Sequence, residues 1–497
     1  MRYLKAVVVA SSLCVARVAA AQEEAVTDEA DGAAKAAEAP KAEASAAVTT
    51  KPEESAQKTE AAVEPPAQTT ATPAEKEARK EEGWSAGIYG FVELDAMRDS
   101  TQSYPESAHN NLIARRGTYP GNHGRFQMTA KNSRVGFNFG APKFGESRAT
   151  ANVELDFFGQ IPTDALQNEY NVFPSVRMRH AWAKLETPIV DVLIGQYHDL
   201  FGWGGSGFYP ASVAFLGLPG QIYHRNPQLR VAKKFGSDAV TLEVAVAAVR
   251  PAQRDAGIPD GQAGLRLSLN KWTGAVAQGS GQPSLVPLGL GVSAIGRRLE
   301  IPEFRPVPGE PYGKTAWGIA INAVLPVIPV KDVDDRGNGL SVNGEFSVGS
   351  GVADMYTGLT GGARFPALPN PGALTTAPLW PQNVDNGLAT FDKNFAPKTL
   401  DWQAFVVGLQ YYLPVFGGKV WVTGNFSQAK SKNILELTPA PNRGSVFSKQ
   451  TYFDANVFVA PLKNFHFALS LQQTQQTYGD GVKAKNQRGQ LAALYFF

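Results

Sequence analysis

Apolar and polar residues alternate strictly along much of the chain beyond residue 83. In the segment 465–472, four apolar residues at odd positions alternate with His466, Ala468, Ser470 and Gln472. The same alternation recurs in 405–413, 153–157 and 265–269. A period of two over five to ten residues predicts a β-strand with one apolar and one polar face.

This pattern predicts sixteen strands, separated by connections that are alternately short and long. The short connections contain Gly, Pro, Asp or Asn, whereas several of the long ones exceed twenty residues. Two connections on the short side, 271–286 and 327–339, are longer than the pattern favours. The sixteen predicted strands are 87–98, 126–140, 147–158, 176–186, 189–197, 227–236, 239–250, 262–270, 287–300, 314–326, 340–350, 402–414, 419–429, 451–460, 464–475 and 488–497.

An even number of strands with one short-looped and one long-looped end is typical of an outer-membrane β-barrel. In lipid every backbone N–H and C=O needs an internal partner, so such strands must close on themselves. We therefore expect an all-β fold, a transmembrane antiparallel barrel formed by residues 83–497. A soluble exported β-sandwich or repeat protein is the alternative, although no fixed repeat period is visible.

The first 21 residues resemble a secretory signal peptide. Arg2 and Lys5 precede a short apolar run, and Ala19, Ala20 and Ala21 fit a cleavage site for small residues. The one cysteine of the chain, Cys14, lies in this segment. The mature protein is then expected to lack thiols, which excludes cysteine-ligated metals and thiol catalysis.

Residues 22–82 form a low-complexity segment rich in Ala, Glu, Lys, Thr and Pro, without an aromatic residue. It holds 15 acidic and seven basic residues. Such a composition buries too little apolar surface to offset the entropy of ordering. We expect a disordered periplasmic spacer, and a tether to another envelope component is the alternative. Beyond residue 82 the charge reverses, with 37 basic and 30 acidic residues.

The chain ends on an alternating strand whose last residue is Phe497. An aromatic residue is favoured at the margin of the apolar band of a barrel. A terminal aromatic on such a strand also resembles the signal that the barrel-insertion machinery reads. We therefore expect that machinery, the lipid bilayer and lipopolysaccharide among the partners of the chain, in the outer membrane of a Gram-negative bacterium.

If the apolar faces meet lipid, their polar partners line the lumen. An arginine that faced lipid at mid-membrane would cost roughly 2–4 kcal/mol. Opposed charges in a narrow aqueous pore select solutes by charge, although they can also merely solvate a wide lumen or pair with one another. On this basis the expected lining comprises Arg134, Arg177, Arg179 and Arg230 together with Glu93, Asp95, Glu154 and Asp156.

The third long connection, 198–226, is unusually apolar and aromatic for an exposed loop. Folding into the barrel would bury its aromatic side chains and narrow the pore. Packing against a neighbouring subunit is the alternative. The expected constriction residues are Phe201, Trp203, Phe208, Tyr209, Phe215 and Tyr223.

Four stretches resemble the DcaP-like trimeric porins of Gram-negative outer membranes: SRVGFNFGAP at 133–142, RMRHAWAKLE at 177–186, LIGQYHDLFG at 193–202 and FLGLPGQIYHRNPQLR at 215–230. The resemblance implies a homotrimer of barrels with an inward loop that takes up small, often dicarboxylic, anions. It also adds Arg225 to the basic lining. Two features depart from the family: Ala214 and Leu216 replace acids beside Phe215, and residues 22–82 lack the heptads of a coiled coil.

The expected function is therefore passive diffusion of small hydrophilic solutes, with a preference for anions. Sugar uptake, with Trp203, Tyr209 and Tyr223 as a stacking surface, is the rival within the same class. A barrel-embedded hydrolase and an envelope tether are rivals of other classes. None of the six histidines lies in a G-x-S-x-G or H-E-x-x-H motif, so no catalytic residue, metal, cofactor or nucleic-acid partner is expected.

Overall fold

The computed structural model describes residues 83–106, 112–159, 175–215, 217–253, 256–303, 309–359, 384–385 and 387–497. All of them belong to the compact unit Glu64–Phe497. The predicted signal peptide 1–21 and the predicted spacer 22–82 lie outside the described residues. No helix in the described part of the chain is both long and apolar enough to cross a membrane.

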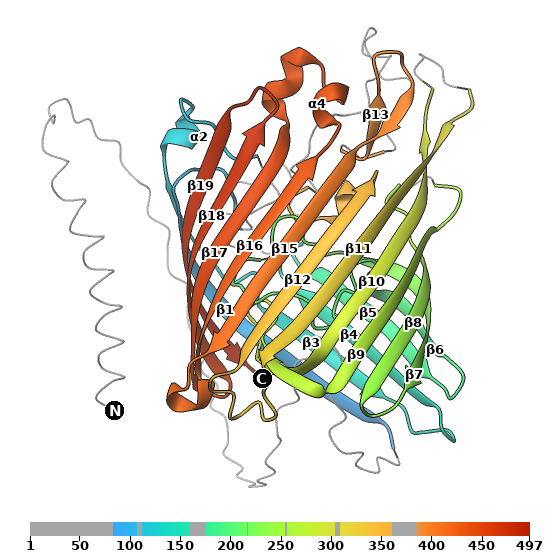
Figure 1. Cartoon of the computed structure of the whole chain (residues 1–497), viewed down its shortest axis with the longest axis vertical. Coiled ribbons are helices and arrows are strands. Elements are labelled where there is room, and N and C mark those ends of the chain that lie inside the picture. Colours follow the sequence, from blue (N-terminus) through green and yellow to red (C-terminus); the bar gives the residue numbers. More distant parts are fainter. Residues whose placement is uncertain are drawn as a thin grey trace, which may run out of the picture. The chain divides into compact units, whose positions relative to one another are not determined.

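The described residues form a closed antiparallel barrel with a wall of sixteen strands (Figure 1). The segments β2 and β3 both pair with β1 and together make one wall strand. The wall closes where β1 also pairs with β19, with Phe91 opposite Phe496. The strands are β1 (Ser85–Asp99), β2 (Arg125–Thr129), β3 (Arg134–Gly140), β4 (Arg148–Asp156), β5 (Arg177–Glu186), β6 (Asp191–His198), β7 (Arg225–Gly236), β8 (Val240–Val249), β9 (Asp260–Val276), β10 (Ser284–Ile301), β11 (Tyr312–Ile328), β12 (Leu340–Ser350), β15 (Asp401–Tyr412), β16 (Val420–Ser431), β17 (Phe447–Leu462), β18 (Phe465–Tyr478) and β19 (Lys483–Phe496).

The predicted all-β barrel is confirmed, and each of the sixteen predicted strands matches one wall strand. Outward residues are mostly apolar and many inward residues are polar, as the alternation predicts, but inner positions of β8, β10 and β11 are apolar, for example Val249, Ile295 and Val324. On β18, Leu469 and Leu471 are about half exposed on the outer surface, whereas Ser470 and Gln472 are buried inside. The outer surface thus offers an apolar belt, and closure leaves no unpaired strand edge in the lipid.

The two ends of the barrel differ. Long connections carry the short elements α2 (Tyr119–Asn122), η1 (Ala353–Met355), β13 (Ala389–Phe391), β14 (Pro397–Thr399), α4 (Ile434–Leu437) and η4 (Ala440–Ser445). They stand at the upper end in Figure 1, and the C-terminus lies at the lower end among the short turns, one of which carries η3 (Val415–Gly418).

The connection expected at 271–286 is much shorter in the structure, because β9 and β10 extend into it. The turn is reduced to residues 277–283, and the register shifts between Pro287 and Leu288. The end of this hairpin lies inside the lumen beside β11, β12 and β15. There Val330 N–H donates to Thr273 O at 2.8 Å, and Gln410 bonds both backbone groups of Ala277 at 2.8 and 2.9 Å.

One predicted face of β5 is wrong. The register of β4 and β5 shifts between Glu154 and Leu155, so that β5 contains a bulge. Arg179 and the next residue, His180, are therefore both buried on the inner side. Beyond the bulge Ala183 is exposed on the outer side, whereas unbroken alternation along the predicted strand 176–186 would put it on the same face as Arg179.

Lys233 falls on the apolar face of β7, where its charged end needs a polar partner. Its ammonium group donates to the carbonyl of Pro188 in the neighbouring short turn. The side chain thus lies along the barrel margin with its charged end at a polar group, as lysine does at membrane interfaces.

Candidate functional site: a charged passage inside the barrel

The loop 198–226 runs through the lumen, and its first half is anchored on the wall formed by β9 and β10. Trp203 Nε1 donates to Val292 O at 3.0 Å, and Phe201 N–H donates to Gln262 Oε1 at 2.9 Å. A Cβ atom at Gly291 would lie 2.7 Å from the Trp203 ring, so this glycine makes room for the indole. Phe201, Trp203 and Phe208 are each at most 3% exposed. These three aromatic residues hold the loop against the wall.

The second half of the loop crosses to the opposite wall. Ala211 O accepts from Asn425 Nδ2 at 2.7 Å, and Ser212 Oγ donates to Asp454 Oδ2 at 2.6 Å. Further along, Ile222 N–H donates to Glu345 Oε1 at 2.7 Å. Buried hydrogen bonds to both walls fix the loop across the lumen.

The turn 277–283 meets this loop from the short-turn end of the barrel. Gly279 N–H donates to Pro210 O at 3.0 Å, and Ser212 N–H donates to Gly279 O at 3.1 Å. The lumen is therefore narrowed by two segments, of which the sequence predicts only the first.

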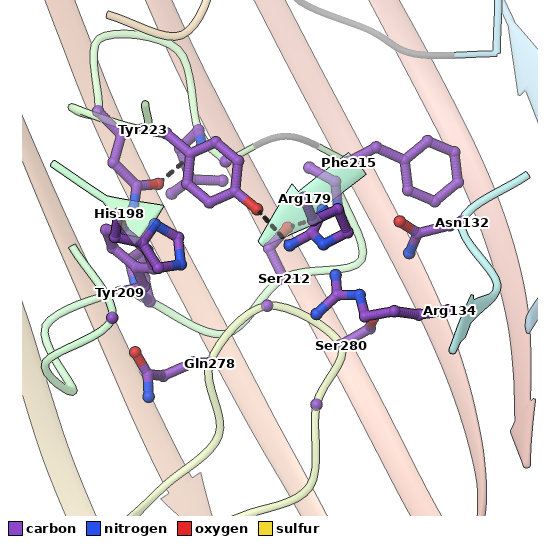
Figure 2. A pocket seen from close by; sticks show the side chains of 18 of the residues that line it. Asn132, Arg134, Arg179, His198, Tyr209, Ser212, Phe215, Tyr223, Gln278 and Ser280 are labelled. Atoms are coloured by element: carbon purple, nitrogen blue, oxygen red, sulfur yellow. Dashed lines mark hydrogen bonds between the residues drawn. The ribbon is translucent and has the colours of Figure 1, made fainter. Parts of the chain in front are cut away.

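A cavity of about 100 Å³ remains between these segments and the wall of β3, β4, β5 and β6. Figure 2 shows Arg134 and Arg179 pointing toward it, with Tyr209 and Tyr223 of the loop on another side and Ser280 of the turn below. Phe215 also lines this cavity. Of the six predicted constriction aromatics, three therefore anchor the loop, and the other three, Tyr209, Phe215 and Tyr223, border the opening that the cavity leaves in the lumen.

Arg179 is the centre of the charged network on the inner wall. Its Nε donates to Glu154 Oε1 at 2.7 Å, and its Nη1 donates to Asp156 Oδ2 at 3.0 Å. Arg177 makes a bidentate pair with the same Asp156, at 2.6 and 2.9 Å. Glu154 also lies 3.6 Å from Arg134 Nη1. The two predicted acidic residues of β4 thus serve as partners for three arginines.

The remaining two predicted arginines are bound by groups other than carboxylates. Arg225 Nη1 donates to Tyr223 Oη at 3.1 Å, and its guanidinium carbon lies 4.9 Å from the centre of that ring. Arg230 donates to Gln228 and to the carbonyl of His198. Among the described residues, no carboxylate forms an ion pair with either of them. Of the predicted lining residues, this part of the wall therefore holds five guanidinium groups and two carboxylates, and Asp199 of the loop is buried nearby.

Tyr223 lies between two of these arginines. Arg179 Nη2 donates to its hydroxyl at 3.3 Å. Burial disfavours ionisation, but the positive charges of Arg179 and Arg225 outweigh it and lower the pKa of Tyr223 to about 6. The hydroxyl is thus poised to carry a negative charge near neutral pH.

The predicted acidic residues of β1 point inward but are not at the opening. Glu93 and Asp95 have no exposed surface. Asn132 Nδ2 donates to Glu93 Oε2 at 2.6 Å, and Gln490 Nε2 donates to Asp95 Oδ1 at 2.8 Å. Packed side chains cover both carboxyl groups, so a solute in the cavity does not contact them.

Two histidines that the sequence pattern did not single out also line the cavity. The rings of His180 and His198 lie 4.8 Å apart, and that of His198 lies 5.9 Å from the ring of Tyr223. His180 reaches the cavity only because of the bulge in β5, and no residue type in the segment predicts that bulge. His198 is the first residue of the aromatic loop, so its position was within reach of the sequence pattern.

No family model matches the sequence, and no curated protein is similar to it in sequence. In structure the chain is similar to the outer membrane channel DcaP of Acinetobacter baumannii, with a TM-score of 0.59 and 18% identity over 84% of this chain and 98% of that one. An anion-selective porin from Comamonas acidovorans (TM-score 0.46, 10% identity, 83% and 100% covered) and the outer membrane protein OmpT of Vibrio cholerae (TM-score 0.44, 9% identity, 84% and 99% covered) are more distant. The resemblance to DcaP-like porins is thus confirmed at the level of the fold.

Proposed function

We propose that this chain is an outer-membrane channel for passive diffusion of small hydrophilic solutes, with a preference for small anions such as dicarboxylates. The observation that carries the proposal is the excess of guanidinium groups around the opening. Three of the five arginines share the two carboxylates of β4, the other two form no ion pair with a described carboxylate, and the acids Glu93, Asp95 and Asp199 are buried.

Charge acts strongly in such a passage because the wall excludes most of the water that would screen it. An anion that enters the cavity meets Arg134 and Arg179, the two arginines that line it. Arg177, Arg225 and Arg230 lie behind them and raise the local potential without needing to contact the solute. A dicarboxylate can exchange its hydration for bonds to two guanidinium groups, whereas a cation meets net repulsion.

The loop and the turn set the size limit in this proposal. Tyr209, Phe215 and Tyr223 form the loop side of the opening, and residues 278–281 form its floor. Both are held by backbone hydrogen bonds, so the opening is expected to keep its width as solutes pass.

Assembly is part of the proposal. We infer a homotrimer in the outer membrane of a Gram-negative bacterium, in contact with lipid and lipopolysaccharide. Phe497, the residue proposed to be read by the insertion machinery, exchanges backbone hydrogen bonds of 3.0 and 3.1 Å with Gly90 on β1. The residue that would begin insertion thus lies at the seam where the barrel closes.

The experiment is a comparison of permeation rates in liposomes that contain the mature protein. Succinate should enter faster than an uncharged polyol of similar size, and the double variant R134Q/R179Q should lose most of this difference. Equal rates for the two solutes in the wild-type protein would refute the anion preference while leaving the channel in place.

Sugar uptake is the second candidate, supported by the tyrosine rings at the opening. The ring centres of Tyr209 and Tyr223 lie 5.4 Å apart. The same liposomes separate the two candidates, since a sugar channel would admit a disaccharide faster than succinate, and the variant Y209A would slow the sugar alone.

A further inference from the structure

The outward face of the barrel carries a group of lysines at one place only among the described strands, the long-loop ends of β16–β19. The register aligns these strands in rows. One row contains Lys430, Lys449, Thr477 and Lys483. The row directly beneath it contains Gln428, Thr451, Gln475 and Lys485. Three of the four lysines, Lys430, Lys483 and Lys485, are exposed, and Lys449 is half-buried.

The residues below these rows show where the rows lie relative to the apolar belt of the barrel. The next row down contains Phe426 and Phe453, which are 40% and 51% exposed on the outer surface, and continues with Gln473 and Gln487 on β18 and β19. Leu471 and Leu491 continue the apolar belt toward the short-turn end, at 63% and 48% exposure. The lysines therefore lie just above the apolar belt, on the side of the long loops, where the head groups of the outer leaflet meet the protein.

The arrangement of charges is unfavourable by itself. Lys430 and Lys449 are directly opposite each other on neighbouring strands. Like charges in such a pair repel and destabilise the sheet, because their Cβ atoms are only about 5 Å apart. Among the described residues none of the four lysines forms an ion pair with a carboxylate. The nearby Asp480 is already bound by Arg115 Nη2 at 2.5 Å.

We infer that this surface, the lysine rows of β16–β19, binds the phosphate groups of a glycolipid of the outer leaflet. A phosphate between opposed lysines converts their repulsion into two charge-assisted contacts. The amide and hydroxyl groups of the lower row add neutral partners for sugar hydroxyls, and the phenylalanines below pack against acyl chains. From the long-loop end toward the apolar belt, the surface thus presents charged, then neutral polar, then apolar side chains, which is the order of phosphate, sugar and acyl chain in a phosphorylated glycolipid.

The site is separate from the passage inside the barrel. Its side chains point outward from the wall, whereas those of the charged passage lie inside. The inference therefore stands whether or not the channel prefers anions, and its variants are expected to leave conductance unchanged.

The test compares three forms of the full-length mature protein: the wild type, the variant K430Q/K449Q/K483Q/K485Q, and the control K143Q/K271Q/K331Q/K419Q. The control removes the same charge from exposed lysines near the short-turn end. Each form is mixed in detergent with fluorescent bis-phosphorylated lipid A, and binding is measured by fluorescence anisotropy. Dephosphorylated lipid A, phosphatidylglycerol and inorganic phosphate are tested as competitors.

The wild type and the control should bind alike, and the lysine variant should bind at least about tenfold more weakly. Dephosphorylated lipid A should not compete, and inorganic phosphate should compete only at much higher concentration. Equal binding by all three forms would overturn the inference, as would efficient competition by phosphatidylglycerol or by inorganic phosphate alone. Unchanged single-channel conductance of the lysine variant shows that it is folded.

Discussion

Arg179 and Tyr223 meet in the lumen, where Arg179 Nη2 donates to the tyrosine hydroxyl at 3.3 Å. The first residue comes from a wall strand and the second from the loop that crosses the barrel. Arg225 Nη1 donates to the same hydroxyl at 3.1 Å. This contact joins the loop 198–226 to the charged wall, so that one ionisable hydroxyl touches the two arginines.

The anion preference should weaken as pH rises through about 6. Below this pH the Tyr223 hydroxyl is neutral, and above its lowered pKa of about 6 it adds one negative charge to the cluster. Reversal potentials measured between pH 5 and 7.5 should therefore shift toward cation permeation. The variant Y223F, which cannot ionise, should show the same reversal potential over this pH range. If the reversal potential of Y223F shifted as much as that of the wild type, another group would be responsible.

Removing Arg134 should lower the anion-to-cation permeability ratio roughly two- to threefold, because one positive charge beside the opening is lost. The measurement is the reversal potential of R134Q in a potassium chloride gradient. The matched control is E93Q, whose carboxyl group is fully covered. A change of selectivity in E93Q as large as that in R134Q would contradict the assignment of Glu93 to the packed interior.

Shortening the turn 277–283 should widen the channel. Replacing these seven residues by Asn-Gly removes the bond between Gly279 and Pro210 and opens the floor of the cavity. Single-channel conductance should rise roughly twofold, while the sign of the selectivity is unchanged because the arginines remain. An unaltered conductance would show that the turn does not border the permeation path.

Replacing Trp203 should destabilise the loop 198–226 without changing the ion selectivity of the channel. The variant W203A removes a buried indole and its bond to Val292 O, at a cost of about 3–5 kcal/mol in the free energy of unfolding. With its anchor lost, the loop should fluctuate, and single-channel recordings should show frequent brief closures. The variant W317A changes an exposed tryptophan of the outer surface and serves as control, since its recordings should resemble those of the wild type.

The wall of the barrel could be predicted from the sequence because alternation is a local property. Lipid outside and polar groups inside impose the same period of two on each strand, from β1 to β19. The inward faces of Glu93, Glu154 and Arg134 follow from that period alone. That inward residues of opposite charge on neighbouring strands can pair, as Arg177 and Asp156 do, could also be expected, although not which residues pair.

Three features of the site could not be predicted because they depend on contacts between distant segments. The bulge in β5 brings His180 inside without a signal in the residues around it. The inward course of the turn 277–283 depends on bonds to Gln410, more than a hundred residues away. The covering of Glu93 and Asp95 likewise depends on partners such as Gln490 near the C-terminus.

The most direct test of the account is the reversal potential of the mature protein in a planar bilayer under a potassium chloride gradient at pH 5, where Tyr223 is neutral. We expect stepwise channel currents whose reversal potential lies toward that of chloride, with the displacement reduced in R134Q/R179Q. Channel currents that reverse toward the potential of potassium would contradict the assignment of the arginine cluster as the selectivity element.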